Sequence, residues 1–352
     1  MVIMSILNNI LPGIDTLIPL LNPAIWLYLP HMQCNFRCAY CYMNRCSNPR
    51  GNSHHPCNYN LPNNLSEING WIFLYGGEPL SDKKLLYSLI ETIRQKTNEP
   101  ICFSTNGSLL TKDDINFFVN NNVKVSLSYD GKYQKYRGFD IFSDKDLTEI
   151  IFYGIKTKVI IAINTVVHNL NYRDYKFNIP NIKIIHDYNY MYPIETSSNS
   201  KFLLTNDSSD MLADEMTLYI KNILLDIGKL PIKDLVYKYP PAAFTMLNQM
   251  LKFKLNEPQK LKLDVPLSEQ IGCVGTDIYG NSICGKGYEM NIKNKCYLDS
   301  ACSNCKFSSI CAYKCPAFNF NKSQCKDTFI YKMYDKVDKL LTFKYQSTNV
   351  II

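Results

Sequence analysis

Three closely spaced cysteines constrain this chain more than any other feature. Cys34, Cys38 and Cys41 follow the spacing C-x3-C-x2-C, which places three thiolates on one short loop. A cubane iron–sulfur cluster is normally held by four cysteines, so three ligands leave one iron open to a small molecule. A zinc site is the alternative, because zinc takes four Cys or His ligands. Downstream residues that could complete a zinc site are Cys46, His54, His55 and Cys57.

Apolar runs alternate with helix-length amphipathic stretches after a short N-terminal lead. The first run, residues 25–29, ends where the cysteine loop begins. Alternating strand and helix signals predict βαβ units and a parallel sheet. Six such units would form a partial barrel, open on one side, with functional loops at the C-terminal ends of the strands. The further strands predicted are residues 71–75, 101–105, 123–128, 159–167 and 182–185, with a helix near 82–96.

Glycine-containing turns follow three of these strands. They are Gly76-Gly77-Glu78-Pro79, Asn106-Gly107 and Asp130-Gly131. Glycine lets the backbone approach a ligand closely, and the Glu78 carboxylate could receive a ligand ammonium group. Each turn by itself is equally consistent with an ordinary chain reversal.

The cysteine loop, with Tyr40 before its third cysteine, resembles that of the radical S-adenosylmethionine (SAM) superfamily. The resemblance implies an α/β fold, a partial (β/α)6 barrel, with a [4Fe-4S] cluster on Cys34, Cys38 and Cys41. It also implies that SAM binds the open iron and yields a 5′-deoxyadenosyl radical, which abstracts a hydrogen atom from substrate. An external flavodoxin or ferredoxin would supply the electron.

Other residues match SAM-contacting blocks of the same superfamily. Glu78 stands where the family contacts the SAM amino group. Ser128 and Arg137 stand in a block resembling S-x-D-G plus arginine, and a guanidinium suits the SAM carboxylate through paired hydrogen bonds. The remaining cofactor-binding candidates by resemblance are Tyr40, Gly76, Gly77 and Asn106.

A second cysteine group lies near the C-terminus, where eight of the fourteen cysteines fall between Cys273 and Cys325. This group resembles the SPASM domain, which houses auxiliary iron–sulfur clusters. The resemblance implies one set formed by Cys302, Cys305, Cys311 and Cys325, and a second formed by Cys273, Cys284 and Cys315. Either Cys296 completes the second set, or one of its irons stays open. A zinc-ribbon-like unit is the alternative.

The predicted organisation has five parts. A lead (1–24) precedes the barrel (25–204), a helical bridging region (205–266), the auxiliary-cluster domain (267–330) and a C-terminal helix (331–352). Helices are predicted at residues 211–228, 242–255 and 329–343. Because a Gly-, Asn- and Lys-rich segment buries little apolar surface, metal must organise the auxiliary-cluster domain.

Composition narrows the cellular context. Fourteen cysteines would suggest disulfides in a secreted protein, but the N-terminus has no basic region and contains Pro12, Pro19 and Pro23. No apolar run is long enough for a membrane span. A cytoplasmic protein with metal-bound thiolates is therefore expected. The net charge of +7 permits an acidic peptide partner, and no basic run with interleaved aromatics indicates nucleic acid.

The resemblance favours an enzyme that modifies a ribosomally made precursor peptide, with a thioether or carbon–carbon crosslink as product. Only 33 residues precede Cys34, so a separate leader-binding protein is one expected partner. An anaerobic sulfatase maturase is the alternative, although Gly285 stands where those enzymes carry an aspartate. A zinc-binding interaction protein is the alternative from another class.

Overall fold

A parallel sheet dominates the structure, a computed structural model of the whole chain. The described residues are 25–29, 33–41, 61, 63–68, 70–179, 183–190, 200–227, 229–255, 274–277, 282–284, 302, 304–308 and 322–348. The strand order is β6-β5-β4-β3-β2-β1-β7-β8. Strands β1 to β6 lie side by side in chain order and all pair in parallel, which confirms the predicted α/β class and the open sheet. Their bounds are β1 Ile25–Tyr28, β2 Ile72–Tyr75, β3 Ile101–Thr105, β4 Val123–Ser128, β5 Ile160–Val167 and β6 Ile185–Tyr190.

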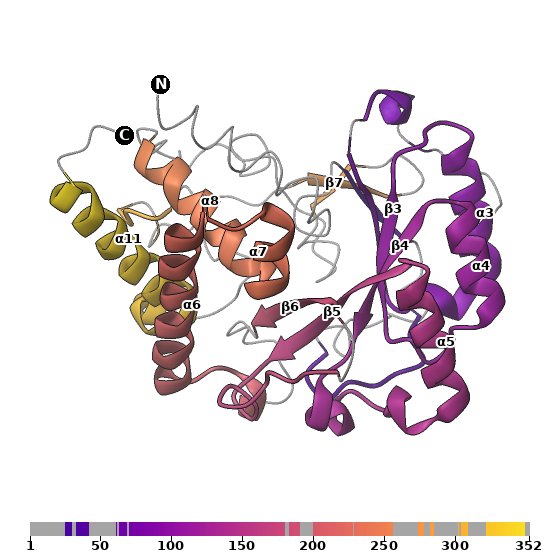
Figure 1. Cartoon of the computed structure of the whole chain (residues 1–352), viewed down its shortest axis with the longest axis horizontal. Helices are drawn as coiled ribbons and strands as arrows, with labels where there is room; N and C mark the ends of the chain where they lie inside the picture. Colours follow the sequence, from indigo (N-terminus) through magenta and orange to yellow (C-terminus); the bar gives the residue numbers. More distant parts are fainter. Residues whose placement is uncertain are drawn as a thin grey trace.

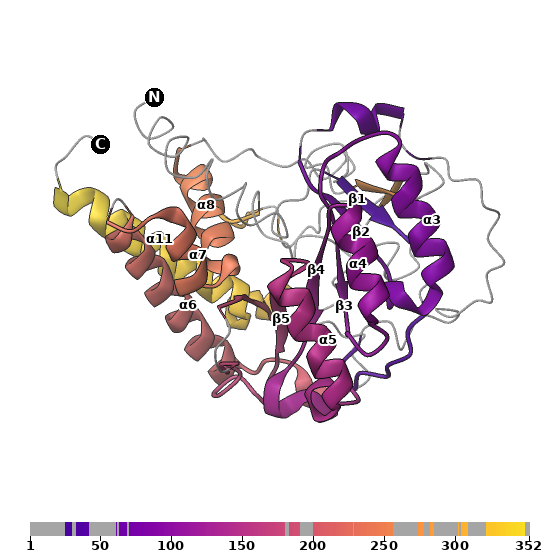
Figure 2. The same cartoon turned by 45° about the vertical axis from the view of Figure 1, so that its right-hand side comes forward.

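Three helices cover one face of this sheet (Figure 2). They are α3 (Lys83–Arg94), α4 (Lys112–Asn120) and α5 (Lys145–Lys156). Each begins at a side-chain cap, from Asp82, Thr111 and Asp144 respectively, which accepts a backbone N–H of the first turn. Leucine, isoleucine and phenylalanine side chains of the helices pack on the apolar face of the strands to form the main core.

The opposite face of the sheet is more polar. Residues paired across parallel strands point to the same face, and Ser128 pairs with Asn164, which pairs with Asp187. Leu127 and Ile163, one residue back, belong instead to the core against the helices. Three neighbouring strands therefore present a row of polar side chains on the face away from α3, α4 and α5.

A hairpin from the C-terminal cysteine group extends the sheet. Strand β7 (Val274–Asp277) pairs in parallel with β1, and β8 (Ser282–Cys284) pairs antiparallel with β7. The sequence did not predict this pairing, because the two strands are short and the partner of β7 lies some 250 residues earlier. Part of the predicted auxiliary-cluster domain thus lies beside the strand that leads into the cysteine loop. The predicted domain bounds stay predictions.

Helices of the C-terminal half gather at the β6 side of the molecule (Figure 1). They are α6 (Asn206–Asp226), α7 (Ile232–Lys238), α8 (Pro241–Leu255) and α11 (Phe329–Thr348). A second core joins them to β5 and β6 through residues such as Tyr188, Met216 and Phe244. None of the helices in the described ranges is long and apolar enough to cross a membrane.

Short 3-10 turns complete the described elements: η2 (Asn63–Glu67), η3 (Pro79–Asp82), η4 (Gly131–Tyr136), η5 (Ile141–Ser143), η6 (Ser200–Phe202) and η9 (Lys322–Asp327).

Two predicted element bounds are wrong. The sixth strand was predicted at residues 182–185, but β6 spans Ile185–Tyr190. Its pairing with β5 continues through the polar residues His186, Asp187 and Asn189, which do not fit an apolar strand pattern. Helix α6 was predicted from Met211, but it begins at Asn206, since Thr205 and Ser208 form a capping box there.

Candidate metal and cofactor site

The loop after β1 brings three thiols together. The thiols of Cys34, Cys38 and Cys41 are each partly buried, and they lie close enough to shift one another's pKa. The Cys41 N–H donates to the Cys38 carbonyl oxygen (3.0 Å), which closes a tight turn. Burial raises the pKa of Cys34 and raises that of Cys38 to about 12. Thiolates at these positions therefore need a bound cation, and metal coordination supplies one.

Three neighbouring strand ends hold this loop. After β2, the Glu78 N–H donates to the Gln33 carbonyl oxygen (2.7 Å). After β3, the Asn106 Nδ2 donates to Asn35 Oδ1 (2.9 Å). After β4, the Ala39 N–H donates to the Tyr136 carbonyl oxygen (2.7 Å). The loop is thus fixed along its length before any metal binds.

Glu78 is buried, with 2% of its surface exposed, and its carboxylate is hydrogen-bonded on both oxygens. Oε1 accepts from Thr105 Oγ1 (2.6 Å) and from the Leu80 N–H (3.1 Å). Oε2 accepts from the Asn106 N–H (2.7 Å). Burial raises the pKa of Glu78, while these hydrogen bonds lower it. The side chain joins the ends of β2 and β3, and three of its roughly four acceptor positions are filled.

Arg137 is also buried, and it forms an ion pair rather than lying on the surface. Its Nη2 lies 3.0 Å from Asp130 Oδ1. The Tyr40 hydroxyl donates to the other oxygen of Asp130, and the guanidinium lies 5.7 Å from the centre of the Tyr40 ring. The structure thus brings two predicted cofactor residues together through Asp130, which the sequence interpretation quoted in a turn but did not assign to the site.

The remaining predicted cofactor residues lie around the same edge of the sheet. Gly76 and Gly77 form the bend after β2, and both are partly buried. Asn106 is buried and uses its side chain on Asn35 and Ser108. Ser128 ends β4 and is partly exposed. Gly107, beside Asn106, has a φ of +79°, and a Cβ there would meet a Leu127 methyl at 2.5 Å, so this turn needs glycine.

Part of the C-terminal cysteine group lies on the helical half of the molecule. The Cys305 N–H donates to the Cys302 carbonyl oxygen (3.1 Å) in a turn whose Phe307 side chain is buried in the second core. The Cys325 carbonyl oxygen accepts from Thr328 Oγ1 (2.6 Å) just before α11. Burial is the largest cause of the raised pKa of Tyr331. Cys305 and Cys325 also raise this pKa, so both thiols lie near the Tyr331 ring.

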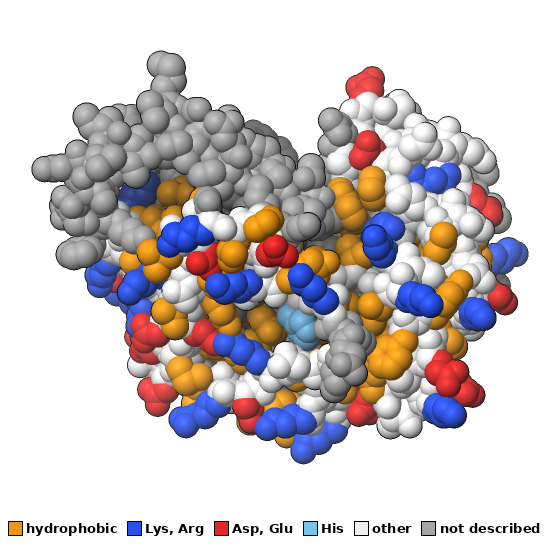
Figure 3. Space-filling model, viewed as in Figure 1, with side chains coloured by type: hydrophobic (Ala, Val, Ile, Leu, Met, Phe, Trp, Pro, Cys, Tyr) orange, Lys and Arg blue, Asp and Glu red, His pale blue; other side chains and the backbone are white. Residues whose placement is uncertain are grey.

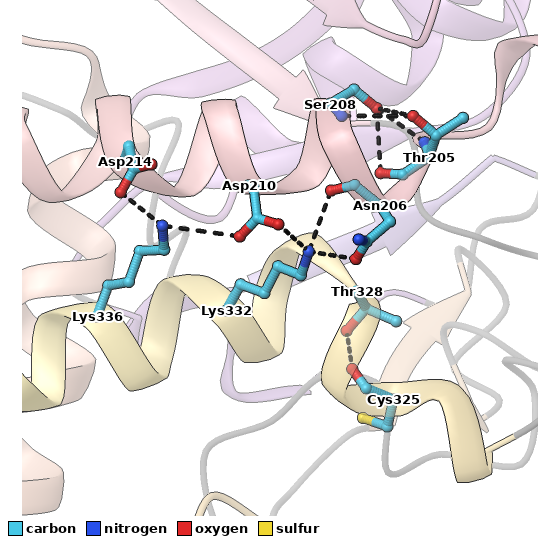
Figure 4. A network of polar contacts seen from close by, with 9 residues as sticks. All are labelled: Thr205, Asn206, Ser208, Asp210, Asp214, Cys325, Thr328, Lys332 and Lys336. Carbon is cyan, nitrogen blue, oxygen red and sulfur yellow. Dashed lines mark hydrogen bonds and ion pairs between the residues drawn. The ribbon is translucent and has the colours of Figure 1, made fainter.

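Figure 4 shows how the start of α11, which follows the η9 turn containing Cys325, is tied to α6. Lys332 donates to the Asn206 carbonyl oxygen (3.0 Å) and to Asp210 (2.5 Å), and Lys336 lies 2.6 Å from Asp214. Of the other predicted ligands, Cys284 ends β8, whereas Cys273, Cys296, Cys311 and Cys315 lie outside the described residues.

Charges of both signs lie side by side over the face seen in Figure 3. Basic side chains pair with acidic ones, as in Lys132 with Asp174 (2.5 Å) and Lys238 with Asp226 (2.6 Å). Among the described residues on this face, basic and acidic side chains are interspersed.

Comparisons with known proteins match this geometry. The family described as "4Fe-4S single cluster domain" matches residues 25–138, which hold the cysteine loop and the turns after β2, β3 and β4. The solved structure of anSMEcpe with bound AdoMet is 16% identical, with a TM-score of 0.57 over 92% of this chain and 98% of that one. The chain has the fold of anSMEcpe. No curated protein sequence matches it.

Two further solved structures are among the matches. Native anSMEcpe with bound AdoMet and the Cp18Cys peptide is 17% identical, with a TM-score of 0.56 over 92% of this chain and all of that one. Streptococcus suis SuiB bound to its precursor peptide SuiA is 14% identical, with a TM-score of 0.48 over 88% of this chain and 70% of that one.

The residues present fit a [4Fe-4S] cluster, the group named in the description of the matching family. No three described His, Cys, Asp or Glu side chains converge on the position of a single metal ion. In a cubane cluster each thiolate binds a different iron, so the ligands need not converge. The Cys34, Cys38 and Cys41 thiols, partly buried on one anchored loop, supply the soft donors that such a cluster requires.

Proposed function

We propose that this chain is an enzyme that binds a [4Fe-4S] cluster through Cys34, Cys38 and Cys41 and uses it with S-adenosylmethionine. Together these groups would supply a 5′-deoxyadenosyl radical, which abstracts a hydrogen atom from substrate. The observation that carries the proposal is the three-thiol loop held by the ends of β2, β3 and β4. The protein's part is to hold the loop, place the substrate and exclude water.

The proposed substrate is a ribosomally made precursor peptide, and the proposed product is a thioether or carbon–carbon crosslink. The fold is that of anSMEcpe, whose structure is known with AdoMet and a peptide bound. In the polar row, Ser128 and Asn164 give the sheet groups with which a peptide backbone could hydrogen-bond. A leader-binding protein and a flavodoxin or ferredoxin electron donor are the further proposed partners.

Auxiliary clusters would serve the second half of such a reaction. Forming a crosslink removes two hydrogens from the substrate. The deoxyadenosyl radical would take one as a hydrogen atom, so a second electron and a proton must also leave the substrate. We place one auxiliary [4Fe-4S] cluster on Cys302, Cys305, Cys311 and Cys325. The second would use Cys273, Cys284 and Cys315, with Cys296 as the fourth ligand or with an iron open to substrate. Reduction potentials of such clusters depend on ligation and burial.

A sulfatase maturase is the second candidate, because anSMEcpe resembles the chain in fold with a TM-score of 0.57. The two candidates differ in substrate rather than in cofactor. Coexpression of this protein with the peptide or sulfatase encoded beside it, followed by mass spectrometry, separates them. A loss of two hydrogens within a short peptide supports crosslinking. Conversion of a sulfatase Cys or Ser to formylglycine supports maturation.

The cofactor proposal is tested by replacing Cys34, Cys38 and Cys41 together with alanine. After anaerobic reconstitution, the triple variant should lose about four iron atoms per chain and all formation of 5′-deoxyadenosine. The matched control is Cys102→Ala, because Cys102 is buried in β3 and belongs to no proposed ligand set. Undiminished iron and 5′-deoxyadenosine in the triple variant would refute the proposal. Stoichiometric zinc without iron in the unmodified protein would favour a zinc-binding interaction protein.

A further inference from the structure

Asp130 is the point at which three separate segments meet beside the cysteine loop. It follows β4, and only 1% of its surface is exposed. Its Oδ1 accepts from Arg137 Nη2 (3.0 Å) and from the Val166 N–H in β5 (3.0 Å). Its Oδ2 accepts from the Tyr40 hydroxyl. One buried carboxylate therefore joins the cysteine loop, the turn after β4 and the end of β5.

Tyr40 is held on its ring faces as well as at its hydroxyl. The centres of the His168 and Phe202 rings lie 5.5 Å and 5.6 Å from the centre of its ring. The Tyr40 hydroxyl donates a hydrogen bond to Asp130 Oδ2, and the Arg137 guanidinium lies 5.7 Å from the centre of the ring. Because Tyr40 stands between Cys38 and Cys41, fixing this ring restricts the two cysteines on either side of it.

The His168 ring, which lies beside Tyr40, is itself held in place by a hydrogen bond. Burial lowers the pKa of His168 to about 4, so this imidazole is neutral. Its Nδ1 accepts from the Leu170 N–H (3.1 Å), which keeps the ring in one orientation against Tyr40. The Gly138 backbone packs on the Phe36 ring of the cysteine loop, where an added Cβ would come within 3.1 Å.

Charge is balanced next to the cysteine loop. Arg137 and Asp130 form an ion pair (3.0 Å), and both contact Tyr40, which is two residues from Cys38. The two opposite charges are buried together, so losing one leaves the other without compensation. A positive charge left near an iron–sulfur cluster favours its reduced form, because reduction adds negative charge.

We propose that Asp130 is a positioning residue for the cysteine loop: it holds Tyr40 in place and offsets the charge of Arg137 beside Cys38. This inference rests on the proposed binding of a [4Fe-4S] cluster by Cys34, Cys38 and Cys41. It assigns Asp130 no contact with substrate or cofactor, since its two oxygens are occupied by Tyr40, Arg137 and Val166.

The test is a potentiometric titration of reconstituted protein, followed by electron paramagnetic resonance. The signal followed is the one missing from the Cys34/Cys38/Cys41 triple-alanine variant. Asp130→Asn keeps the shape of the side chain but leaves Arg137 unpaired, so the midpoint potential should move to a more positive value. Asp130→Asn combined with Arg137→Gln removes both charges and should bring the potential back towards that of the unmodified protein. Tyr40→Phe removes the hydrogen bond without a change of charge and should leave the potential nearly unchanged.

The positioning of the cysteine loop is tested separately, by the rate at which a chelator removes iron. Losing a hydrogen bond to a charged group should speed the removal of iron by a chelator about tenfold in both Tyr40→Phe and Asp130→Asn. Asp174→Asn is the matched control, because it makes the same charge change at an exposed ion pair with Lys132. An unshifted potential in Asp130→Asn, or a shift that Arg137→Gln does not reverse, would overturn the inference. If the unmodified protein gives no signal that depends on the three cysteines, the proposed function itself fails.

Discussion

At the scale of single residues, Asp187 has a raised pKa. This residue lies in the polar row with Ser128 and Asn164. Burial raises the pKa of Asp187 to about 6, although its carboxylate accepts hydrogen bonds from the backbone of Tyr188 and Ala242. Ala242 lies in the first turn of α8, so Asp187 helps to connect β6 with that helix. Because folding raises the pKa of Asp187, this carboxyl group makes the folded state less stable as pH rises.

We predict that Asp187→Asn gains stability relative to the unmodified protein as pH rises. The folded-state pKa is above the unfolded value of about 4, so protonated Asp187 stabilises the fold at low pH, and this contribution is lost as pH rises through about 6. Between pH 5 and pH 8 the difference in unfolding free energy should change by about 1 kcal/mol in favour of the variant. Urea unfolding at the two pH values measures it.

Asp174→Asn serves as the control for this pH effect. Its ion pair with Lys132 is exposed and lowers its pKa, so Asp174 stays charged in both states throughout this pH window. The Asp174 variant should therefore show a constant offset between pH 5 and pH 8. A constant offset for Asp187→Asn as well would contradict the assigned direction.

Glu78 illustrates a buried carboxylate that stabilises the site through hydrogen bonds. We predict that Glu78→Ala lowers the free energy of unfolding by about 3 kcal/mol, because it leaves donors from Leu80, Thr105 and Asn106 without an acceptor. Glu67→Ala, at an exposed position in η2, should change it by no more than about 0.5 kcal/mol. Equal effects of the two substitutions in urea unfolding would show that Glu78 has no such structural role.

At the scale of elements, the sequence predicted most of the sheet. Short apolar runs bounded by glycine turns marked β1 to β5, because buried parallel strands read as continuous apolar segments. Strand β6 was misplaced, since His186 and Asp187 interrupt that pattern. The role of Asp130 could not be read from the sequence, because its partner Tyr40 lies 90 residues away and only the folded chain brings them together.

The pairing of α6 with α11 includes contacts from partly buried lysines. Lys332 has 11% of its side chain exposed and contacts Asn206 and Asp210 of α6. We predict that Lys332→Met lowers the unfolding free energy by about 1–2 kcal/mol, because it removes hydrogen bonds to a carbonyl and a carboxylate. Lys339→Met is the control within the same helix, since Lys339 is 75% exposed and pairs only with Asp335 among the described residues. The control should lose less than about 0.5 kcal/mol in the same urea titration.

At the scale of the whole molecule, the C-terminal cysteine group is distributed over both halves of the structure. Cys284 ends the hairpin that extends the sheet beside β1, whereas Cys302, Cys305 and Cys325 lie with α11 and the second core. Of the described cysteines, Cys302, Cys305 and Cys325 of the first proposed set therefore lie on the helical half, and Cys284 of the second proposed set lies on the sheet.

This distribution predicts that the clusters are separable. Replacing Cys302 and Cys325 together with alanine should remove about four iron atoms per chain, because both belong to one proposed auxiliary set. Reductive cleavage of S-adenosylmethionine should persist, since Cys34, Cys38 and Cys41 lie on a loop held by β2, β3 and β4. Product formation should stop, because an electron acceptor has been lost. Iron analysis, 5′-deoxyadenosine release and peptide mass spectrometry on one preparation measure these three outcomes. Unchanged iron content would show that Cys302 and Cys325 hold no cluster, and loss of cofactor cleavage would show that the two sites are not independent.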